Sequence, residues 1–279
     1  MSFPFTVPLS PKEVITCTVN QRAPLGTRGA TADGRIYRYA KAGGTALAKG
    51  FLCQSEVPAN SWTNTTYANM STPWLGTLGT TSVPITTRSL QFSATGGATL
   101  TIAKDYFKDG WLWVSGTVTS AGQMVKIKTH SVCSSNSSGT SGECLVEFED
   151  GYALSEVIDT AAEVSMIKSE YDDVIVAPIA PLTGSLVGVP NAHVTASYYF
   201  WAQTWGACSV HAEAAAIMTG KTVVCSTNVA GTVAGVTAST DVEGTLHLGV
   251  PVGRPISSSA QGTALQASTN ILVHLTIAP

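Results

Sequence analysis

Apolar residues alternate with polar residues over short stretches along most of this chain. β-branched and aromatic side chains recur at every second position of these stretches, which is the period of a β-strand. The clearest examples are residues 35–40, 111–114, 124–128 and 144–148. The dipeptides Asp33-Gly34, Asp109-Gly110 and Asp150-Gly151 stand at the edges of such stretches, where a tight turn needs a residue at positive φ. The pattern predicts an all-β protein.

Two short stretches are the candidates for helices. Residues 160–169 are short, and residues 211–218 (HAEAAAIM) have helical propensity over hardly two turns of length. Neither stretch changes the all-β prediction.

The first 30 residues are predicted to form an extended arm. Phe3, Phe5, Val7 and Leu9 are apolar at alternate positions, and the prolines between them disfavour a helix or a central strand. An arm with one apolar face is expected to bind a partner surface, so these four residues are the candidate partner-binding residues. The alternative is that the arm folds back on its own domain.

The rest of the chain is expected to form two β-barrel or sandwich-like domains. A length of 279 residues suits one large or two ordinary domains. The proline-rich segment 177–181 resembles a linker, so the boundaries are set at 31–177 and 178–279. The second domain is the smaller one, and regularly spaced glycines interrupt its short apolar runs, as at the corners of a small barrel.

Composition excludes several classes of protein. Charged residues make up only 12% of the chain and the net charge is -3, which gives no basic face for nucleic acid. A hydrophobic content of 44% is too high for a disordered chain. We find no apolar run long enough to cross a membrane and no secretory leader, so we expect synthesis in a cytoplasm and no membrane partner.

Six cysteines are scattered without C-x-x-C spacing, and we expect free, mostly buried thiols. They are Cys17, Cys53, Cys133, Cys144, Cys208 and Cys225. Two pairs stay open as disulfides, since Cys133 and Cys144 flank one strand connection and Cys208 and Cys225 flank another.

No motif in the sequence predicts catalysis, a metal or a cofactor. Gly220-Lys221-Thr222 lacks the first glycine and the following helix of a phosphate-binding loop. The histidines do not fall at metal-ligand spacing; they are His130, His193, His211, His247 and His274. Glu147 and Glu149 share a strand face that we expect to be solvated. A hydrolase would need such an acid pair, or a Ser–His pair, to converge in a cleft.

An aromatic strand is predicted at residues 198–206. Tyr199, Trp201, Gln203 and Trp205 would lie on one face of it, with further aromatic residues on the other. Because charged neighbours are missing on both flanks, we expect a core or subunit-interface strand. The alternative is an exposed platform on which sugars or bases stack.

Four segments resemble a family of head structural proteins encoded by tailed bacteriophages. The first is residues 33–47 (DGRIYRYAKAGGTAL), and the others are residues 108–114 (KDGWLWV), 170–175 (EYDDVI) and 199–206 (YFWAQTWG). The Ser-rich loop at 131–143 and the cysteines depart from the family pattern.

The resemblance implies a decoration, or cement, protein that binds the outer surface of an icosahedral head, as a homotrimer, without chemistry of its own. Its partners would be the major capsid protein and further copies of itself, and the arm residues Phe3, Phe5, Val7 and Leu9 would contact the capsid. The alternative is a receptor- or carbohydrate-binding module of a phage tail or fibre, which would expose Trp62, Trp74 or Trp111 to sugars.

Overall fold

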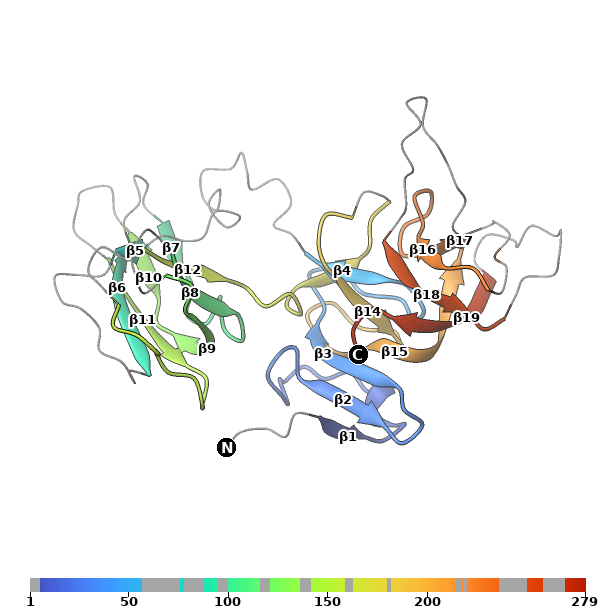
Figure 1. The fold of residues 1–279 in the computed structure, drawn as a ribbon, viewed down its shortest axis with the longest axis horizontal. Helices are drawn as coiled ribbons and strands as arrows, with labels where there is room; N and C mark the ends of the chain where they lie inside the picture. The colour runs from blue at the N-terminus through green and yellow to red at the C-terminus, as the bar shows by residue number, and fades with distance from the viewer. Residues whose placement is uncertain are drawn as a thin grey trace, which may run out of the picture. The chain divides into compact units, whose positions relative to one another are not determined.

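The expected all-β architecture is confirmed. The computed structural model describes residues 6–56, 76–77, 88–94, 100–115, 121–135, 142–158, 163–179, 182–213, 217, 220–235, 250–257 and 269–279. Over these ranges the regular structure is β-strand, apart from one 3-10 turn, η1 (Glu13–Ile15) (Figure 1). Two of the expected Asp-Gly turns place their glycines, Gly34 and Gly151, at positive φ, and in the third the aspartate, Asp109, takes that conformation.

The expected division of the chain at residues 30 and 177 is wrong. One compact unit, the barrel unit, covers Pro58–Ser169, and the other, the sheet unit, is made of Phe3–Val57 and Glu170–Pro279. The proline-rich segment is no linker, because Ala177 is buried and its amide donates to the Leu52 carbonyl at 2.9 Å. A local pattern of prolines does not reveal that the chain returns to a sheet it left more than a hundred residues earlier.

The barrel unit is a closed antiparallel barrel in the order β11-β6-β5-β12-β8-β9, beside a two-stranded sheet of β7 and β10. Its strands are β5 (Gly76–Thr77), β6 (Ser89–Ala94), β7 (Leu100–Ile102), β8 (Trp111–Ser115), β9 (Met124–His130), β10 (Cys133–Ser135), β11 (Gly142–Phe148) and β12 (Glu163–Ile167). Alternate side chains such as Val125 and Ile127 fill the interior, which is the period-2 pattern seen in the sequence.

The helix expected at residues 160–169 is wrong. Residues 163–167 form β12, which pairs with β5 and β8. Val164 and Met166 point into the core from alternate positions. Pairing with neighbouring strands and burial outweigh a weak local helical propensity.

The sheet unit holds an 11-stranded sheet whose main path runs β1-β2-β3-β15-β17-β16-β18-β19, and β19 also pairs with β15. Its strands are β1 (Val7–Leu9), β2 (Arg28–Thr31), β3 (Ile36–Lys41), β4 (Cys53–Ser55), β13 (Val174–Val176), β14 (Leu186–Pro190), β15 (Tyr199–Ala212), β16 (Val223–Cys225), β17 (Val233–Gly235), β18 (Pro251–Pro255) and β19 (Thr269–Thr276). The path from β15 through β17, β16, β18 and β19 therefore returns to β15 and encloses a core of its own.

β15 is 14 residues long and changes partner halfway. Its first half pairs with β3, and its second half pairs with β19. The register shifts between Gln203 and Trp205, and Gly206 follows with φ +89°. The change of partner is therefore built on a bulge and a glycine. His211 and Ala212 end this strand, so the helix expected at 211–218 does not begin there; most of its remaining residues lie outside the described ranges.

The N-terminal segment belongs to the sheet unit as far as it is described. Val7–Leu9 pairs in parallel with β2, and Leu9 is only 7% exposed. A Cβ atom at Gly29 would clash with Leu9 Cδ1, so this glycine makes room for the leucine. The alternative stated for the arm, that it folds back on its own domain, holds for residues 6–30, and the partner-binding arm is wrong for them. Phe3 and Phe5 lie outside the described residues.

Candidate functional site

An exposed face of the sheet unit is built by β15, β18 and β19. Residues paired across the strands point to the same side, and in β15 and β19 the residues between them, such as Val210 and Val273, are buried. We call this surface the outer face; it consists of Trp205, Ala207, Ser209, His211, Arg254, Ile256, Asn270, Leu272, His274 and Thr276. Ile256 and Leu272 are 49% and 40% exposed, and the Ile256 amide donates to the Leu272 carbonyl at 2.7 Å. Two large apolar side chains therefore lie exposed next to each other, one on β19 and the other directly after β18.

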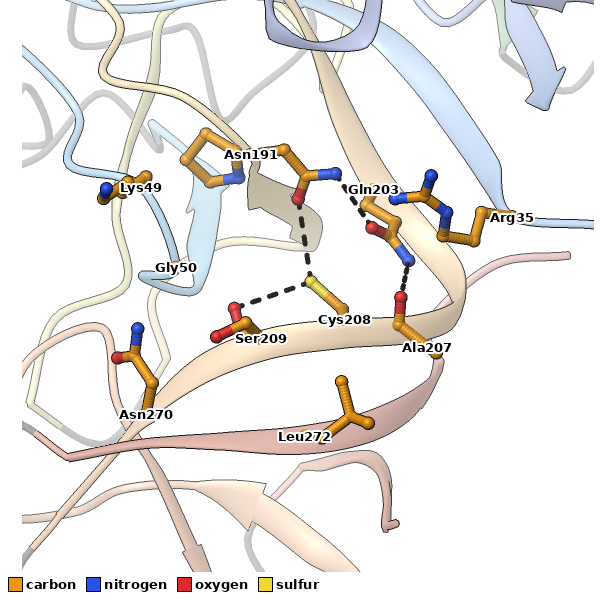
Figure 2. Close-up of a pocket in the computed structure, with 11 residues that line it drawn as sticks. Arg35, Lys49, Gly50, Asn191, Gln203, Ala207, Cys208, Ser209, Asn270 and Leu272 are labelled. Carbon is orange, nitrogen blue, oxygen red and sulfur yellow. Dashed lines mark hydrogen bonds between the residues drawn. The ribbon is translucent and has the colours of Figure 1, made fainter. Parts of the chain in front are cut away.

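A hollow of about 420 Å³ opens where β15 bends (Figure 2). Its charged and polar lining consists of Arg35, Lys49, Asn191, Gln203, Ser209 and Asn270, and Leu272 lies at its border. Lys49 and Asn270 lie on one side of the hollow and Arg35 on the opposite side. The Lys49-Gly50 turn is held in place by Gly50, whose amide donates to the Pro190 carbonyl and whose carbonyl accepts from the His211 amide, both at 2.9 Å.

The floor of this hollow is a hydrogen-bonded network around Gln203. The Gln203 Nε2 group donates to the carbonyls of Trp205 and Ala207 at 3.1 and 2.9 Å. Its Oε1 atom accepts from Asn191 Nδ2 at 3.0 Å and from the Tyr37 hydroxyl at 3.4 Å. The side chain is fully buried. Gln203 therefore connects the first half of β15 to two backbone carbonyls that follow the bulge.

The titratable groups of the floor stay neutral. Burial raises the pKa of the Tyr37 hydroxyl to about 12, against the opposing charge of Arg35. Burial likewise raises the pKa of the Cys208 thiol to about 12, and again Arg35 opposes the shift. A thiol with a raised pKa is a poor nucleophile. The Cys208 thiol instead donates to Asn191 Oδ1 at 3.8 Å, so these groups support the fold of the hollow.

A second hollow of about 510 Å³ adjoins the first at Arg35 and Ala207. Arg35 Nε donates to Asp33 Oδ2 at 2.8 Å, and the ring of Trp205 meets that of His274 edge to face at 5.5 Å. Aromatic, acidic and basic side chains therefore line one opening.

The aromatic strand residues divide between core and surface. Tyr199 stacks on Tyr39 at 5.8 Å, and Trp201, which is nearly buried, lies 4.9 Å from the same ring. Gln203 lies in the core, whereas Trp205 is half-buried on the outer face. The bulge in β15 breaks the single face that the sequence pattern predicts.

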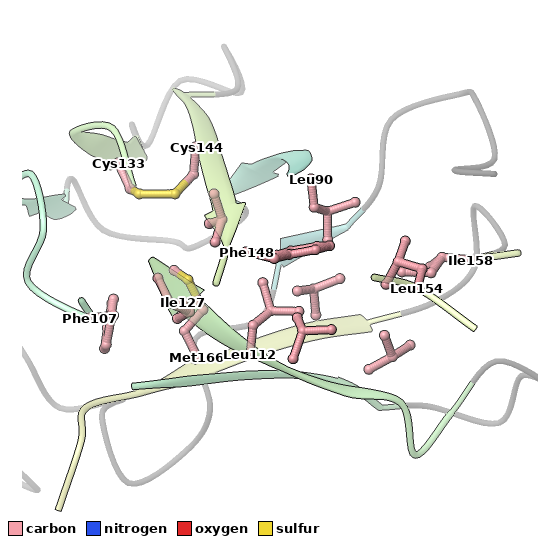
Figure 3. Close-up of a cluster of buried hydrophobic side chains, with 14 of the residues drawn as sticks. Leu90, Phe107, Leu112, Ile127, Cys133, Cys144, Phe148, Leu154, Ile158 and Met166 are labelled. Atoms are coloured by element: carbon pink, nitrogen blue, oxygen red, sulfur yellow. A yellow bond between two sulfur atoms is a disulfide. The ribbon is translucent and has the colours of Figure 1, made fainter. Parts of the chain in front are cut away.

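A second candidate cluster, made of Cys133, Cys144 and His130, lies in the barrel unit, and Figure 3 shows its two cysteines. Cys133 and Cys144 form a disulfide with their Cα atoms 4.6 Å apart, so the expectation of free thiols is wrong for this pair. Cys208 and Cys225 are free and buried. The bonded pair lies in the barrel core, where it joins β10 to β11.

His130 completes this cluster, and its ligand atom lies within 4.8 Å of the two sulfur atoms. Its Nε2 atom accepts from the Phe107 amide at 3.0 Å, so Nδ1 carries the proton and donates to the Ser131 carbonyl at 2.6 Å. Burial lowers the pKa of His130, against the Ser131 hydrogen bond and the charge of Asp105. Two bonded sulfurs and a fully hydrogen-bonded imidazole do not fit a metal ion.

The remaining residues considered for chemistry do not converge in the described part of the chain. Glu147 is exposed on β11, and Glu149, beyond a register shift in that strand, is half-buried. Burial raises the pKa of Glu149. His193 is exposed, His211 stacks against Phe51 at 4.3 Å, and His247 lies outside the described residues.

Sequence reasoning missed Lys49, Asn191, Ser209 and Asn270. They come from four separate segments, and none of them belongs to a recognisable motif. Only strand pairing brings them around one hollow.

Among the described residues, no helix is both long and apolar enough to span a membrane. Comparisons of the chain with protein-family models, with curated proteins and with solved structures gave no match.

Proposed function

We propose that this chain is a structural virion protein that binds the outside of an icosahedral phage head as a decoration, or cement, protein and acts there as a homotrimer. Its partners would be the major capsid protein and two further copies of itself. The proposal begins from the four segments that resemble phage head proteins. Segment 33–47 contains β3, segment 108–114 leads into β8, and segment 199–206 is the first half of β15, so the resembling residues belong to the framework of both units.

The observation that carries the proposal is the outer face of the sheet unit. Ile256 and Leu272 are exposed there beside Ala207 and Ser209, and the first hollow, with its charged and polar side chains, borders Leu272. Exposed apolar side chains ringed by polar groups are typical of surfaces that bind other proteins. A β protein with few charged residues and such a face is suited to a stable complex, because association then depends on the apolar area buried and on shape complementarity.

The chemistry of the described buried groups favours binding over catalysis. Tyr37 and Cys208 are kept neutral by burial, and both nitrogen atoms of His130 are used in hydrogen bonds within the barrel unit. These groups hold strands and turns in position. A surface that recognises a neighbouring protein needs such rigid support and no reactive group.

The capsid contact proposed for the N-terminus is now restricted to Phe3 and Phe5. Val7 and Leu9 pack in the sheet unit, so they are not available to another protein while β1 is paired.

The test is binding to purified heads that lack this protein. We expect the protein to co-sediment with the heads to a fixed occupancy, and light scattering to give about three times the chain mass of 28.9 kDa. The double variant Phe3→Ser/Phe5→Ser should lower occupancy without changing stability. The matched control is Ile15→Ser, since Ile15 is 56% exposed in the same N-terminal segment. A protein that stays monomeric and does not sediment with heads contradicts the proposal.

The second hollow favours one other candidate function, a carbohydrate-binding module of a tail or fibre. Trp205 lies there with Asp33, Arg35 and His274, and an aromatic ring beside charged groups suits a sugar. Trp111 meets Tyr152 edge to face at 6.1 Å, and Trp62 and Trp74 lie outside the described residues. Quenching of tryptophan fluorescence by oligosaccharides, lost in Trp205→Ala, would favour this function over head decoration.

A further inference from the structure

Four polar groups around the first hollow have donor atoms to spare. Among the described residues, the side chains of Lys49, Ser209 and Asn270 make no hydrogen bond or ion pair. Arg35 uses its Nε atom on Asp33 and its guanidinium group lies 5.9 Å from the centre of the Tyr37 ring, but its two terminal nitrogens make no hydrogen bond or ion pair with a described residue. In the floor, by contrast, Gln203 and Asn191 are engaged with each other and with neighbouring groups. These four residues, which we call the rim of the hollow, therefore offer hydrogen-bond donors that the fold does not use.

The charge of this rim has one sign. Arg35 and Lys49 line the hollow from opposite sides (Figure 2), and no carboxylate lies among its described lining residues. The nearest ion-pair partner of Arg35, Asp33, faces the adjoining second hollow. Two cations, an amide and a hydroxyl match an anionic oxygen group, because such a group accepts several hydrogen bonds at once.

The surroundings of the hollow favour a protein segment over a free ion. Leu272 lines the hollow, and Ile256, which directly follows β18, donates its amide to the Leu272 carbonyl. A small inorganic anion would leave both side chains exposed, whereas a segment with an acidic and an apolar residue side by side would use the cations and cover the apolar pair. The cations of the hollow and the apolar pair beside it therefore suit the binding of such a segment.

We propose that the hollow lined by Arg35, Lys49, Ser209 and Asn270 is a binding site for a carboxylate side chain of an acidic, partly apolar segment in a neighbouring protein. The carboxylate lies between Arg35 and Lys49, and the apolar residue beside it covers Leu272 and Ile256. This inference rests on the proposed function, in which the neighbour is another protein of the assembly.

The experiment uses the full-length protein labelled with ¹⁵N and two short blocked peptides, one of alternating glutamate and leucine and one of alternating glutamine and leucine. We expect the glutamate peptide to shift the amide resonances of Gly50, Ser209 and Asn270. The glutamine peptide should bind about fivefold more weakly, which corresponds to one exposed ion pair. Equal binding of the two peptides, or shifts confined to other surfaces, overturns the proposal.

Charge variants give a second measurement that does not depend on folding defects. Lys49 lies at the rim and Lys221 is exposed elsewhere on the sheet unit, so Lys49→Gln should weaken binding of the glutamate peptide and Lys221→Gln should not. Equal effects of the two variants would show that only the net charge of the protein affects peptide binding, and this would contradict the proposed site.

Failure of this site and failure of the proposed function give different results. If the protein decorates heads and Lys49→Gln leaves the occupancy and peptide binding unchanged, the site is wrong and the proposed function stands. If the glutamate peptide binds at the hollow but no heads are decorated, the site stands and the partner is another acidic protein.

Discussion

The Nδ2 group of Asn191 donates a hydrogen bond to Oε1 of Gln203 at 3.0 Å. Asn191 directly follows β14, and Gln203 lies at the bulge of β15, so this bond joins the end of one strand to the point where its neighbour changes partner. The same Gln203 side chain binds two backbone carbonyls beyond the bulge. We therefore expect the bend of β15, and with it the hollow beside the bend, to depend on this pair of amides.

We expect Gln203→Leu to destabilise the sheet unit by about 2–4 kcal/mol, because the carbonyls of Trp205 and Ala207 lose the Gln203 amide and Asn191 Nδ2 loses one of its two acceptors. Tyr37→Phe removes two bonds, the longer one to the same Gln203 oxygen and the one that its hydroxyl accepts from Asn191 Nδ2 at 3.1 Å, and should cost about 1–2 kcal/mol. Urea unfolding, read by hydrogen exchange of peptides from β15, measures both. Equal stability of Gln203→Leu and the unchanged protein would show that the bend does not need the amide.

Leu9→Ala should destabilise the sheet unit by about 2–3 kcal/mol, because Leu9 is buried beside Trp201 over Gly29. Lys12→Ala, at an exposed position of the same segment, should change stability by less than about 0.5 kcal/mol. Thermal unfolding measures both variants. If Leu9→Ala has no effect, β1 is detached in solution and Val7 and Leu9 become available again as partner contacts.

The Cys133–Cys144 disulfide should stabilise the barrel unit by about 3 kcal/mol, since it closes a short loop in the unfolded chain. The double variant Cys133→Ala/Cys144→Ala should therefore lower the melting temperature of that unit, while Cys17→Ser in the sheet unit should not. Intact mass after alkylation in denaturant should give four modified thiols before reduction and six after it. Six modified thiols without a reductant would exclude the bond.

His130 should make the barrel unit less stable as the pH falls below neutrality. Burial lowers the pKa of the folded imidazole, so between that value and the unfolded value of about 6.5 the unfolded chain binds more protons. Stability then decreases as the pH falls through this window and is constant above it. Denaturant unfolding at a series of pH values measures the slope.

The variant His130→Asn should remove this slope, and His193→Asn, at an exposed histidine, should leave it unchanged. Asp105 is a separate group. Burial by itself would raise the pKa of its carboxyl, but hydrogen bonds from Thr129 and from the His130 amide outweigh burial and hold the pKa below its usual value. The stabilisation that the ionised Asp105 carboxyl gives the folded barrel unit is therefore lost only at a pH more acidic than the window of His130. A slope that survives in His130→Asn would have to come from another group.

Two predictions on secondary structure failed for the same reason. Residues 163–167 and His211-Ala212 have local helical propensity, yet they form strands because neighbouring strands pair with them and bury alternate side chains. The domain boundary at 177 failed because a proline-rich stretch reveals only where a strand is interrupted. The division into two units depends on which strand Val174–Val176 pairs with, namely β4, and this contact joins distant parts of the sequence.

The residues of the candidate site were harder to predict from the sequence than the strands and the domain boundary. Trp205 was placed on the face of Gln203 by a period of two, and one bulged residue moved it to the outer face. No motif in the sequence marks Lys49, Asn191, Ser209 and Asn270 as residues of one site. Their grouping follows from the pairing of β15 with β19 and from the hydrogen bonds that hold Gly50 between Pro190 and His211.

The sequence by itself determined the all-β class, the places of many turns and the burial of most alternating apolar positions, because these depend on the period of the strand and on the backbone freedom of residues such as Gly34. The tertiary structure alone decided the insertion of one unit into the other, the bond between Cys133 and Cys144, the folding back of Leu9 and the grouping of polar donors at the bend of β15. Each of these is a contact between distant residues, and a local pattern carries no information about which distant segment supplies the partner.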